Sequence, residues 1–458
     1  MESIFKFMNP NISQPIAVLS NDEIREILVK RIDQQKQAVG IVVGVIEPAS
    51  RRVVTYGNLA KDDARALDGD TIFKIGSITK VFTSLLLADM VNRKEVTFDD
   101  PAARYLPENV RMPERSGKSI TLLDLSTHRS GLPPVPGNLK PKEAANPYAG
   151  YSVADLYQFL SSYTLPRDPG SEFEYSNLGA GILGHLLANR AGTDYESLIR
   201  SRITQPLRMP DTSIMLSSSM EQRMATGHNA LLAPVANWDL PTLAGAGALR
   251  SSANDMLTLL EAFLGYRESP LAPAMNAMFE IRRPVGKTKF EIGLAWHIFG
   301  ESAWHSGGTG GFRSFAGYDP KARTGVVVLS NASTPSGVDD LGAHIWNPKV
   351  PLADPEPPKQ RTEIQVDPKL LDNYTGRYQL APNRSLEISR DGDRLFAQGF
   401  GAQAIGGPKF EMFAESEKNF FVKVTGSQIT FEIGPEGRAT SLIMHRAGGE
   451  PMPAPRLS

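Results

Sequence analysis

The sequence predicts an α+β protein, with an antiparallel sheet flanked by helices, an all-helical region and then a small β-barrel. Strand-like runs near both ends of residues 1–346 enclose a series of helical patterns, which is typical of a sheet built from both ends of one domain. Residues 347–363 hold five prolines among many charges, and this composition indicates a linker. Residues 364–458 show short strand-like runs with turns between them, which is typical of a small barrel.

The first elements are expected to be a helix, a strand pair and a second helix. Residues 21–37 place apolar side chains on one side of a polar helix. Residues 39–46 and 53–56 predict two strands joined by a turn. A β-branched and aromatic run at 71–75 then meets a glycine. After it, an apolar helical pattern extends over residues 77–92.

The middle of the chain is mainly helical. We expect helices at residues 119–127, 153–163, 178–189 and 253–263. Residues 133–150 are rich in proline and predict a long irregular loop. Loops of this length often contribute to function.

Three strand-like runs, at residues 291–299, 313–318 and 325–329, complete the predicted sheet. Beyond the linker the sequence pattern changes to short strand-like runs with turns between them. In the barrel we expect strands near residues 374–378, 385–388, 394–398, 420–424, 429–433 and 442–445.

The composition excludes several classes of function. The 458 residues carry 49 Lys+Arg against 50 Asp+Glu without a long basic run, so nucleic acid is not an expected partner. The lack of cysteine excludes disulfides, thiolate metal sites and a cysteine nucleophile. The histidines are scattered, so we expect no metal and no other cofactor, and we interpret His128, His185 and His297 as structural.

No secretion signal or membrane span is expected. The N-terminus lacks a basic segment followed by a long apolar run, and no apolar stretch is long enough to cross a bilayer. The expected location is therefore the cytoplasm, or the periplasm or exterior if an N-terminal signal has been removed. The expected partner is a small-molecule or peptide substrate, and a homo-oligomer remains open.

Ser77 and Lys80 carry the first chemical signal. Their spacing in a helix puts both side chains on one face, one turn apart. A buried lysine has a lowered pKa and can accept the proton of the serine hydroxyl. The helix N-terminus adds free N–H groups that favour a developing anion. Alone, the pattern also fits a serine that begins a helix and a lysine that reaches solvent.

Tyr175 and Asn177 carry the second signal. A tyrosine can act as a general base if a nearby cation, such as Lys80, lowers its pKa. An asparagine amide can both donate to and accept from a substrate amide. Alone, the two residues also fit a core tyrosine and an asparagine that caps the next helix.

The third signal is His305-Ser-Gly307-Gly308. Glycines allow the backbone to approach a ligand closely. The backbone N–H groups of Gly308 and Ser77 could form an oxyanion hole. His305 could bind a substrate carboxylate or tune the tyrosine. Alone, the segment also fits a turn between two strands.

Taken in order, Ser77-x-x-Lys80, Tyr175-x-Asn177 and His305-x-Gly307 resemble the motifs of the serine β-lactamase and penicillin-binding-protein superfamily. The sequence is most similar to the branch that contains class C β-lactamases, family VIII carboxylesterases, D-aminopeptidases and DD-peptidases. The resemblance covers roughly residues 20–345, and segments 127–132 and 245–252 support it. The region from about residue 365 resembles the lipocalin-like domain that follows many such hydrolases.

The resemblance implies a β-lactamase/transpeptidase-like fold and a serine hydrolase that acts through an acyl-enzyme. It assigns catalysis to Ser77, Lys80 and Tyr175, the oxyanion hole to the backbone of Ser77 and Gly308, and substrate binding to Asn177, His305 and Gly307. Class C enzymes have Lys-Thr-Gly where this chain has His305-Ser-Gly307, and histidine is only partly charged at neutral pH. Expected substrates are therefore esters, amides or peptides with D-amino acids.

Other functions fit the same residues. An acyltransferase or peptide cyclase would use the same acyl-enzyme with an amine in place of water. A penicillin-binding receptor, or a β-lactamase with slow turnover, would stay acylated. A binding scaffold without catalysis has no need for Ser77, Lys80, Tyr175 and Asn177 together.

Overall fold

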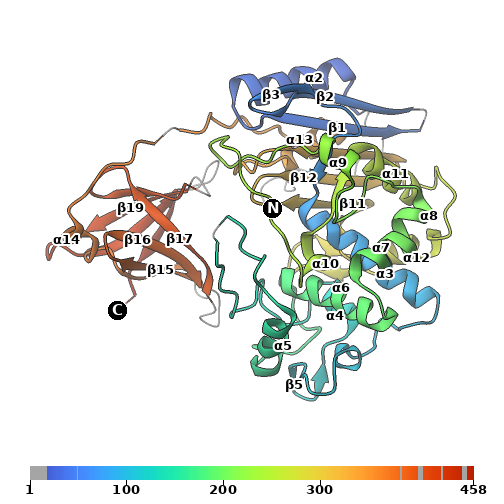
Figure 1. The fold of residues 1–458 in the computed structure, drawn as a ribbon, viewed down its shortest axis with the longest axis horizontal. Coiled ribbons are helices and arrows are strands. Elements are labelled where there is room, and N and C mark those ends of the chain that lie inside the picture. The colour runs from blue at the N-terminus through green and yellow to red at the C-terminus, as the bar shows by residue number, and fades with distance from the viewer. Residues whose placement is uncertain are drawn as a thin grey trace.

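The computed structural model describes residues 18–457 except 49, 144, 360, 382–383, 401–405, 424–426 and 446–450. Figure 1 shows a larger body that contains the first strands and most of the helices, and a smaller barrel formed by the last part of the chain. An extended segment after α13 (Asp339–Trp346) joins them. The predicted fold class is confirmed, whereas the proposed domain limits stay predictions.

An antiparallel sheet forms the centre of the larger body. Among the described residues its strand order is β3-β2-β1-β13-β12-β11-β10-β9-β8. Strand β1 pairs with β13, so that Ile41 lies opposite Ser330 and both ends of this body meet in the sheet, as predicted. The strands are β1 (Gly40–Glu47), β2 (Ser50–Ala60), β3 (Asp63–Ala66), β8 (Arg283–Pro284), β9 (Glu291–Ile292), β10 (His297–Phe299), β11 (Ser302–Gly308), β12 (Arg313–Asp319) and β13 (Thr324–Ser330).

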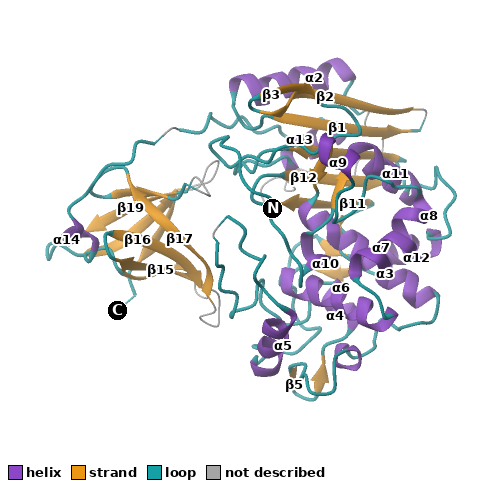
Figure 2. Ribbon diagram, viewed as in Figure 1, coloured by secondary structure: helices purple, strands orange, loops and turns teal. Residues whose placement is uncertain are grey.

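Alternate residues of β1 face two separate cores, because successive side chains of a strand point to opposite faces. Ile41, Val43 and Val45 lie in the core formed with α2 (Asn21–Val29) and α13. Val42 and Ile46, on the opposite face, belong to the larger core, to which α11 (Ala253–Phe263) contributes. Figure 2 shows strands of the sheet between α2 and the group of helices around α3 and α6.

Helix α3 (Thr79–Asn92) lies at the centre of the helical region. Every residue from Thr79 to Met90 is buried, and a helix that is buried on all sides is surrounded by other elements. Helices α6, α10 and α12 pack against it. The other elements here are α4 (Leu122–Ser126), α5 (Val153–Ser162), α6 (Asn177–Ala191), α7 (Tyr195–Ile199), α8 (Gln205–Leu207), α9 (Ser218–Arg223), α10 (Ala244–Gly247), α12 (Ala272–Glu280), and the short strand pairs β4 (Ile72–Lys74) with β7 (Arg250–Ser252) and β5 (Glu114–Arg115) with β6 (Lys118–Ser119).

Two parts of the sheet differ from the sequence prediction. Residues 291–299 form two short strands, β9 and β10, because the chain turns between them and Ala295 adopts a left-handed conformation with φ of 64°. Strand β11 contains Gly307 and Gly308, two glycines that favoured a turn in the sequence. Helices α12 and α13 were also not predicted.

The C-terminal region forms a nearly closed barrel. In its described part, eight antiparallel strands follow one another from β14 to β21, and Tyr378 of the first forms a bridge with Arg456. Tyr374, Phe420 and Phe431 fill the interior. After α14 (Pro368–Leu371) the strands are β14 (Gly376–Ala381), β15 (Arg384–Asp391), β16 (Arg394–Phe400), β17 (Gly406–Ala414), β18 (Asn419–Phe421), β19 (Gln428–Ile433), β20 (Ala439–His445) and β21 (Met452–Pro455). The lipocalin-like assignment stays a prediction.

The first part of the linker is bound to the larger body. Arg31 is buried, pairs with Asp340 at 2.6 Å and donates to the carbonyl of Ala353 at 3.3 Å. Gln37 donates through its amide to the carbonyl of Glu356 at 2.9 Å. These contacts fix the place where the linker leaves the larger body.

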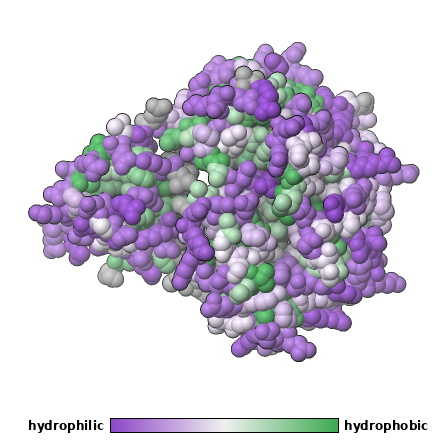
Figure 3. Space-filling model, in the orientation of Figure 1, coloured by the Kyte–Doolittle hydropathy of each residue, from purple (hydrophilic) through white to green (hydrophobic). Residues whose placement is uncertain are grey.

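The surface seen in Figure 3 is mostly hydrophilic, and its hydrophobic residues lie in small separate groups. Among the described residues, the most exposed large hydrophobic side chain is that of Met215, with an exposed fraction of 75%. No helix within the described part of the chain is long and apolar enough to cross a membrane.

Candidate active site

Ser77 lies at a sharp turn between strand β4 and the buried helix α3. The turn is a single 3₁₀ turn, Gly76–Ile78. Gly76 has a φ of 51°, and a Cβ at this position would lie 2.6 Å from the backbone nitrogen of Gly308. Glycine is therefore needed both for the backbone conformation and for the close approach of β11.

Lys80 is buried one turn after Ser77 and faces three uncharged acceptors. Its Nζ donates to the Ser77 Oγ at 2.9 Å, to the Asn177 Oδ1 at 2.8 Å and to the Ala246 carbonyl at 2.6 Å. Burial lowers the pKa of Lys80 to about 7. The predicted pairing of this lysine with the serine is therefore present, and it places an easily deprotonated amine beside the hydroxyl.

Tyr175 and Asn177 come from the start of α6. Ser176 caps this helix by accepting the Gly179 N–H at 2.9 Å, which leaves the residues on either side of it directed toward Lys80. The Lys80 Nζ lies 5.0 Å from the centre of the Tyr175 ring. Burial raises the pKa of the Tyr175 phenol, and the hydrogen bond with Ser77 acts in the opposite direction. The phenol is therefore protonated at neutral pH.

Three buried histidines surround the Tyr175 ring. The ring centroids of His128, His305 and His297 lie 4.5, 6.3 and 6.4 Å from that of Tyr175. Burial lowers the pKa of all three imidazoles, so they are neutral at pH 7. His128 and His297 were interpreted as structural from the sequence, and the structure places them beside a candidate catalytic residue.

His128 holds Tyr175 and its two sequence neighbours through three contacts. Its carbonyl accepts the Glu174 N–H at 2.8 Å, and its Nδ1 accepts the Ser176 N–H at 3.1 Å. Its ring packs against that of Tyr175. His128 also adopts a left-handed conformation with φ of 57°, which is uncommon outside glycine. It thus fixes the backbone on both sides of Tyr175.

Strand β11 passes directly against the turn that carries Ser77. A Cβ on Gly307 would overlap the Ile75 carbonyl oxygen, so only glycine fits there. Gly308 borders the same cavity as Ser77. His305 is not among the residues that line the cavity. Its Nδ1 contacts the Ser306 carbonyl at 2.7 Å, and its ring is buried near Tyr175.

The cavity at Ser77 has a volume of about 50 Å³ and is lined by ten residues, none of them charged. Ser77, Asn177 and Gly308 are among these lining residues. Lys80 and Tyr175 do not line the cavity. Two residues of the wall, Tyr148 and Trp238, were not singled out in the sequence. Tyr148 lies in the loop of residues 133–150, whose length indicated a functional role, but no pattern marked the residue itself. Trp238 reaches the site only through the tertiary fold.

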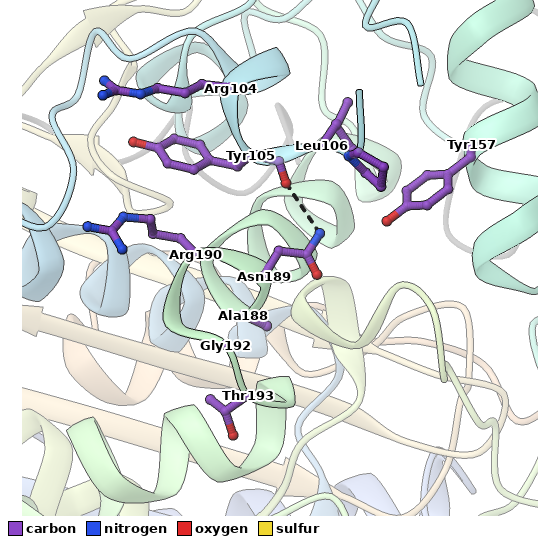
Figure 4. Close-up of a pocket in the computed structure, with 10 residues that line it drawn as sticks. Arg104, Tyr105, Leu106, Tyr157, Ala188, Asn189, Arg190, Gly192 and Thr193 are labelled. Atoms are coloured by element: carbon purple, nitrogen blue, oxygen red, sulfur yellow. Dashed lines mark hydrogen bonds between the residues drawn. The ribbon is translucent and has the colours of Figure 1, made fainter. Parts of the chain in front are cut away.

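Larger hollows lie elsewhere and lack this chemistry. One of about 700 Å³ is bordered by Arg104, Asn189 and Arg190. Figure 4 shows the Asn189 amide directed toward the backbone oxygen of Tyr105, a contact of 3.3 Å. Both arginines have protein partners, Asp100 for Arg104 and the Glu95 carbonyl for Arg190. Cavity size therefore does not locate the candidate active site.

The arrangement suits attack by a serine on a carbonyl group. A neutral Lys80 can accept the Ser77 proton, and the backbone of Ser77 and Gly308 borders the space where an oxyanion would form. Among the described residues, no group of three or more His, Cys, Asp or Glu side chains is placed to hold a metal ion.

Comparison with known proteins identifies the family. The family model described as Beta-lactamase matches residues 26–346. The chain belongs to the Beta-lactamase family. Membership of this family makes it a serine hydrolase, which confirms both the class of enzyme and the resemblance found in the sequence. A second model, for a domain of unknown function (DUF3471), matches residues 360–455.

Relatives within the Beta-lactamase family include peptidases and lactamases. D-alanyl-D-alanine-carboxypeptidase/endopeptidase AmpH of Escherichia coli K12 is 28% identical over 314 residues, which cover 65% of this chain and 80% of that protein. Penicillin-binding protein 4* of Bacillus subtilis is 23% identical over 425 residues, which cover 86% of this chain and 90% of that protein. A class C β-lactamase structure from Rhodobacter sphaeroides matches with a TM-score of 0.60 and 25% identity over 71% of this chain and 96% of that chain.

Proposed function

We propose that this chain hydrolyses esters, amides or peptides with D-amino acids through an acyl-enzyme on Ser77. The observation that carries the proposal is the position of the Lys80 amine together with its lowered pKa. Its amine is buried, bonded to the Ser77 Oγ at 2.9 Å, and has its pKa lowered to about 7. Much more of the amine is therefore uncharged at neutral pH than for an ordinary lysine, and this form can accept the serine proton.

The two steps follow from this geometry. As the Ser77 Oγ bonds to the substrate carbonyl carbon, its proton passes to Lys80, and the N–H groups of Ser77 and Gly308 hold the oxyanion. The bond to the leaving group then breaks, and the leaving group takes a proton from the cluster of Lys80 and the protonated Tyr175. Water then attacks the acyl carbonyl carbon and passes a proton to Lys80. The bond to the Ser77 Oγ breaks, and Ser77 takes this proton back as the acid leaves.

The surroundings of His305 favour uncharged substrates. This imidazole is buried and burial holds its pKa well below its usual value, so it supplies no positive charge for a substrate carboxylate at neutral pH. Of its two proposed roles, tuning of the tyrosine agrees better with its position near Tyr175. Asn177 lines the cavity and remains a proposed substrate contact, and Gly308 remains proposed for the oxyanion hole. Gly307, also proposed to bind substrate, lies against Ile75 and is not among the residues that line the cavity.

The proposal is tested by steady-state turnover of p-nitrophenyl butyrate by the wild type, Ser77→Ala and Ser84→Ala. Ser84 lies on the same helix but bonds to Ser126, so its loss should leave turnover in place. We expect Ser77→Ala to lose at least a thousandfold in kcat. Turnover by Ser77→Ala at the wild-type rate would refute the proposal.

Similarity to AmpH and to penicillin-binding protein 4* favours a second candidate, hydrolysis of a D-alanyl-D-alanine peptide. It is tested by release of D-alanine from a diacetyl-lysyl-D-alanyl-D-alanine peptide. Release that depends on Ser77 would support it. A stable penicillin adduct with no turnover of any substrate would instead indicate the receptor alternative.

A further inference from the structure

Two segments far apart in the sequence form the outer wall of the cavity at Ser77. Tyr148 comes from the long loop before α5, and Trp238 from the segment before α10. Their ring centroids lie 5.8 Å apart with an angle of 59° between the planes. Leu240 and Leu243 extend this apolar wall.

Hydrogen bonds join the two segments on both sides of Tyr148 in the sequence. On one side, the Asn146 Nδ2 donates to the Asp239 Oδ2 at 2.9 Å, and the Asp239 N–H donates to the Asn146 Oδ1 at 2.8 Å. On the other side, the Thr242 Oγ1 donates to the Tyr151 carbonyl at 2.5 Å. We call the reciprocal pair of Asn146 and Asp239 the clasp.

Trp238 is also held from the protein interior. The buried amine of Lys74 donates to the Trp238 carbonyl. The indole lies so close to Gly310 that a Cβ there would overlap its Nε1. The indole is therefore held against the glycine-rich turn between β11 and β12.

We propose that the clasp holds Tyr148 and Trp238 against the cavity at Ser77 and that, among esters, this wall favours short, uncharged acyl groups over long ones. The inference rests on the proposed function and adds its selectivity. A cavity of about 50 Å³ is far smaller than the roughly 300–1,000 Å³ of typical ligand pockets. One misplaced methylene group in such a pocket changes kcat/KM about 10- to 200-fold.

The test compares kcat/KM for p-nitrophenyl octanoate and p-nitrophenyl acetate, which share a leaving group. We expect the wild type to prefer acetate at least tenfold. Asn146→Asp places two carboxylates against each other and should raise the octanoate-to-acetate ratio at least tenfold. The exchange Asn146→Asp with Asp239→Asn restores both hydrogen bonds and should return the ratio to within twofold of the wild type. Trp238→Ala, which removes the wall itself, should raise the ratio as well.

Other outcomes would overturn the inference. Equal hydrolysis of both esters by the wild type would overturn it. Retention of the wild-type ratio by both Asn146→Asp and Trp238→Ala would also overturn it. Thermal melting establishes that each variant is folded, and Trp238→Ala provides the comparison if Asn146→Asp does not fold. A wild type that forms no acetyl adduct on Ser77 would overturn the proposed function, and the inference with it.

Discussion

Two buried lysines near Ser77 both have a lowered pKa but make different contacts. Burial lowers the pKa of both Lys74 and Lys80 to about 7. Lys80 donates to Ser77, whereas Lys74 donates to the carbonyl of Trp238. The pairing of Ser77 with Lys80 could be predicted from sequence because helical spacing determines it. The position of Lys74 could not, since its partner comes from a distant loop.

The lowered pKa of Lys80 predicts the pH dependence of the enzyme. The reactive form is the neutral amine, so kcat/KM should rise with pH through about 7 and fall roughly tenfold per unit below it. Because the pKa of Tyr175 is raised, its ionisation should cause no decline below about pH 10. The measurement is kcat/KM for a neutral ester from pH 5 to 9.

Lys74→Met serves as the control for this pH profile. It removes the other lysine of similar pKa and should leave the rise at about pH 7 in place. Disappearance of the rise in Lys74→Met would show that Lys80 is not the group responsible.

His128 is expected to position Tyr175. His128→Ala removes the acceptor of the Ser176 N–H and places alanine in a left-handed conformation, so kcat should fall at least tenfold. His128→Asn keeps an acceptor and tolerates that conformation, so it should recover much of the activity. Wild-type kcat in a folded His128→Ala protein would contradict this role. Kinetics and melting of both variants provide the test.

Among the elements, strand β11 shows where local sequence signals fail. Glycines usually weaken a strand, so its sequence favoured a turn. The strand forms because β10 and β12 pair on either side of it, and Gly307 allows it to pass against Ile75. In contrast, α3 and α6 could be predicted closely, because their apolar patterns are long and their starts are marked by turn and cap residues.

Gly307→Ala tests the close contact between β11 and the Ser77 turn. The added methyl group overlaps the Ile75 carbonyl oxygen, so we expect a loss of about 3 kcal/mol in the free energy of unfolding and loss of most activity. Gly399→Ala on β16 is the matched control, since no atom lies within 4 Å of its Cβ position. Urea denaturation and kcat/KM provide the comparison. Equal stability of the two variants would contradict the contact.

At the scale of the whole molecule, the two bodies have separate cores. The order of a sheet-and-helix domain, a linker and a barrel could be predicted from sequence, because composition changes sharply at the prolines. The docking of the linker through Arg31 and Gln37 could not, because it depends on side chains more than 300 residues away in the chain.

The barrel is expected to shape access for larger substrates. In Figure 1 the loop of residues 133–150 projects from the larger body on the side where the barrel lies, and this loop carries Tyr148. Removal of residues 365–458 should leave hydrolysis of p-nitrophenyl acetate within twofold and change hydrolysis of bulky esters at least fivefold. Unchanged rates on both substrates in a folded protein would contradict this role.

The most direct test of the central claim is the mass of the intact protein, quenched in acid after mixing with p-nitrophenyl butyrate and then mapped by peptide digestion. We predict a transient butyryl group on the peptide that contains Ser77 in the wild type, and none in Ser77→Ala. A butyryl group on another residue during turnover, or turnover by Ser77→Ala, would contradict the assignment of Ser77 as the nucleophile.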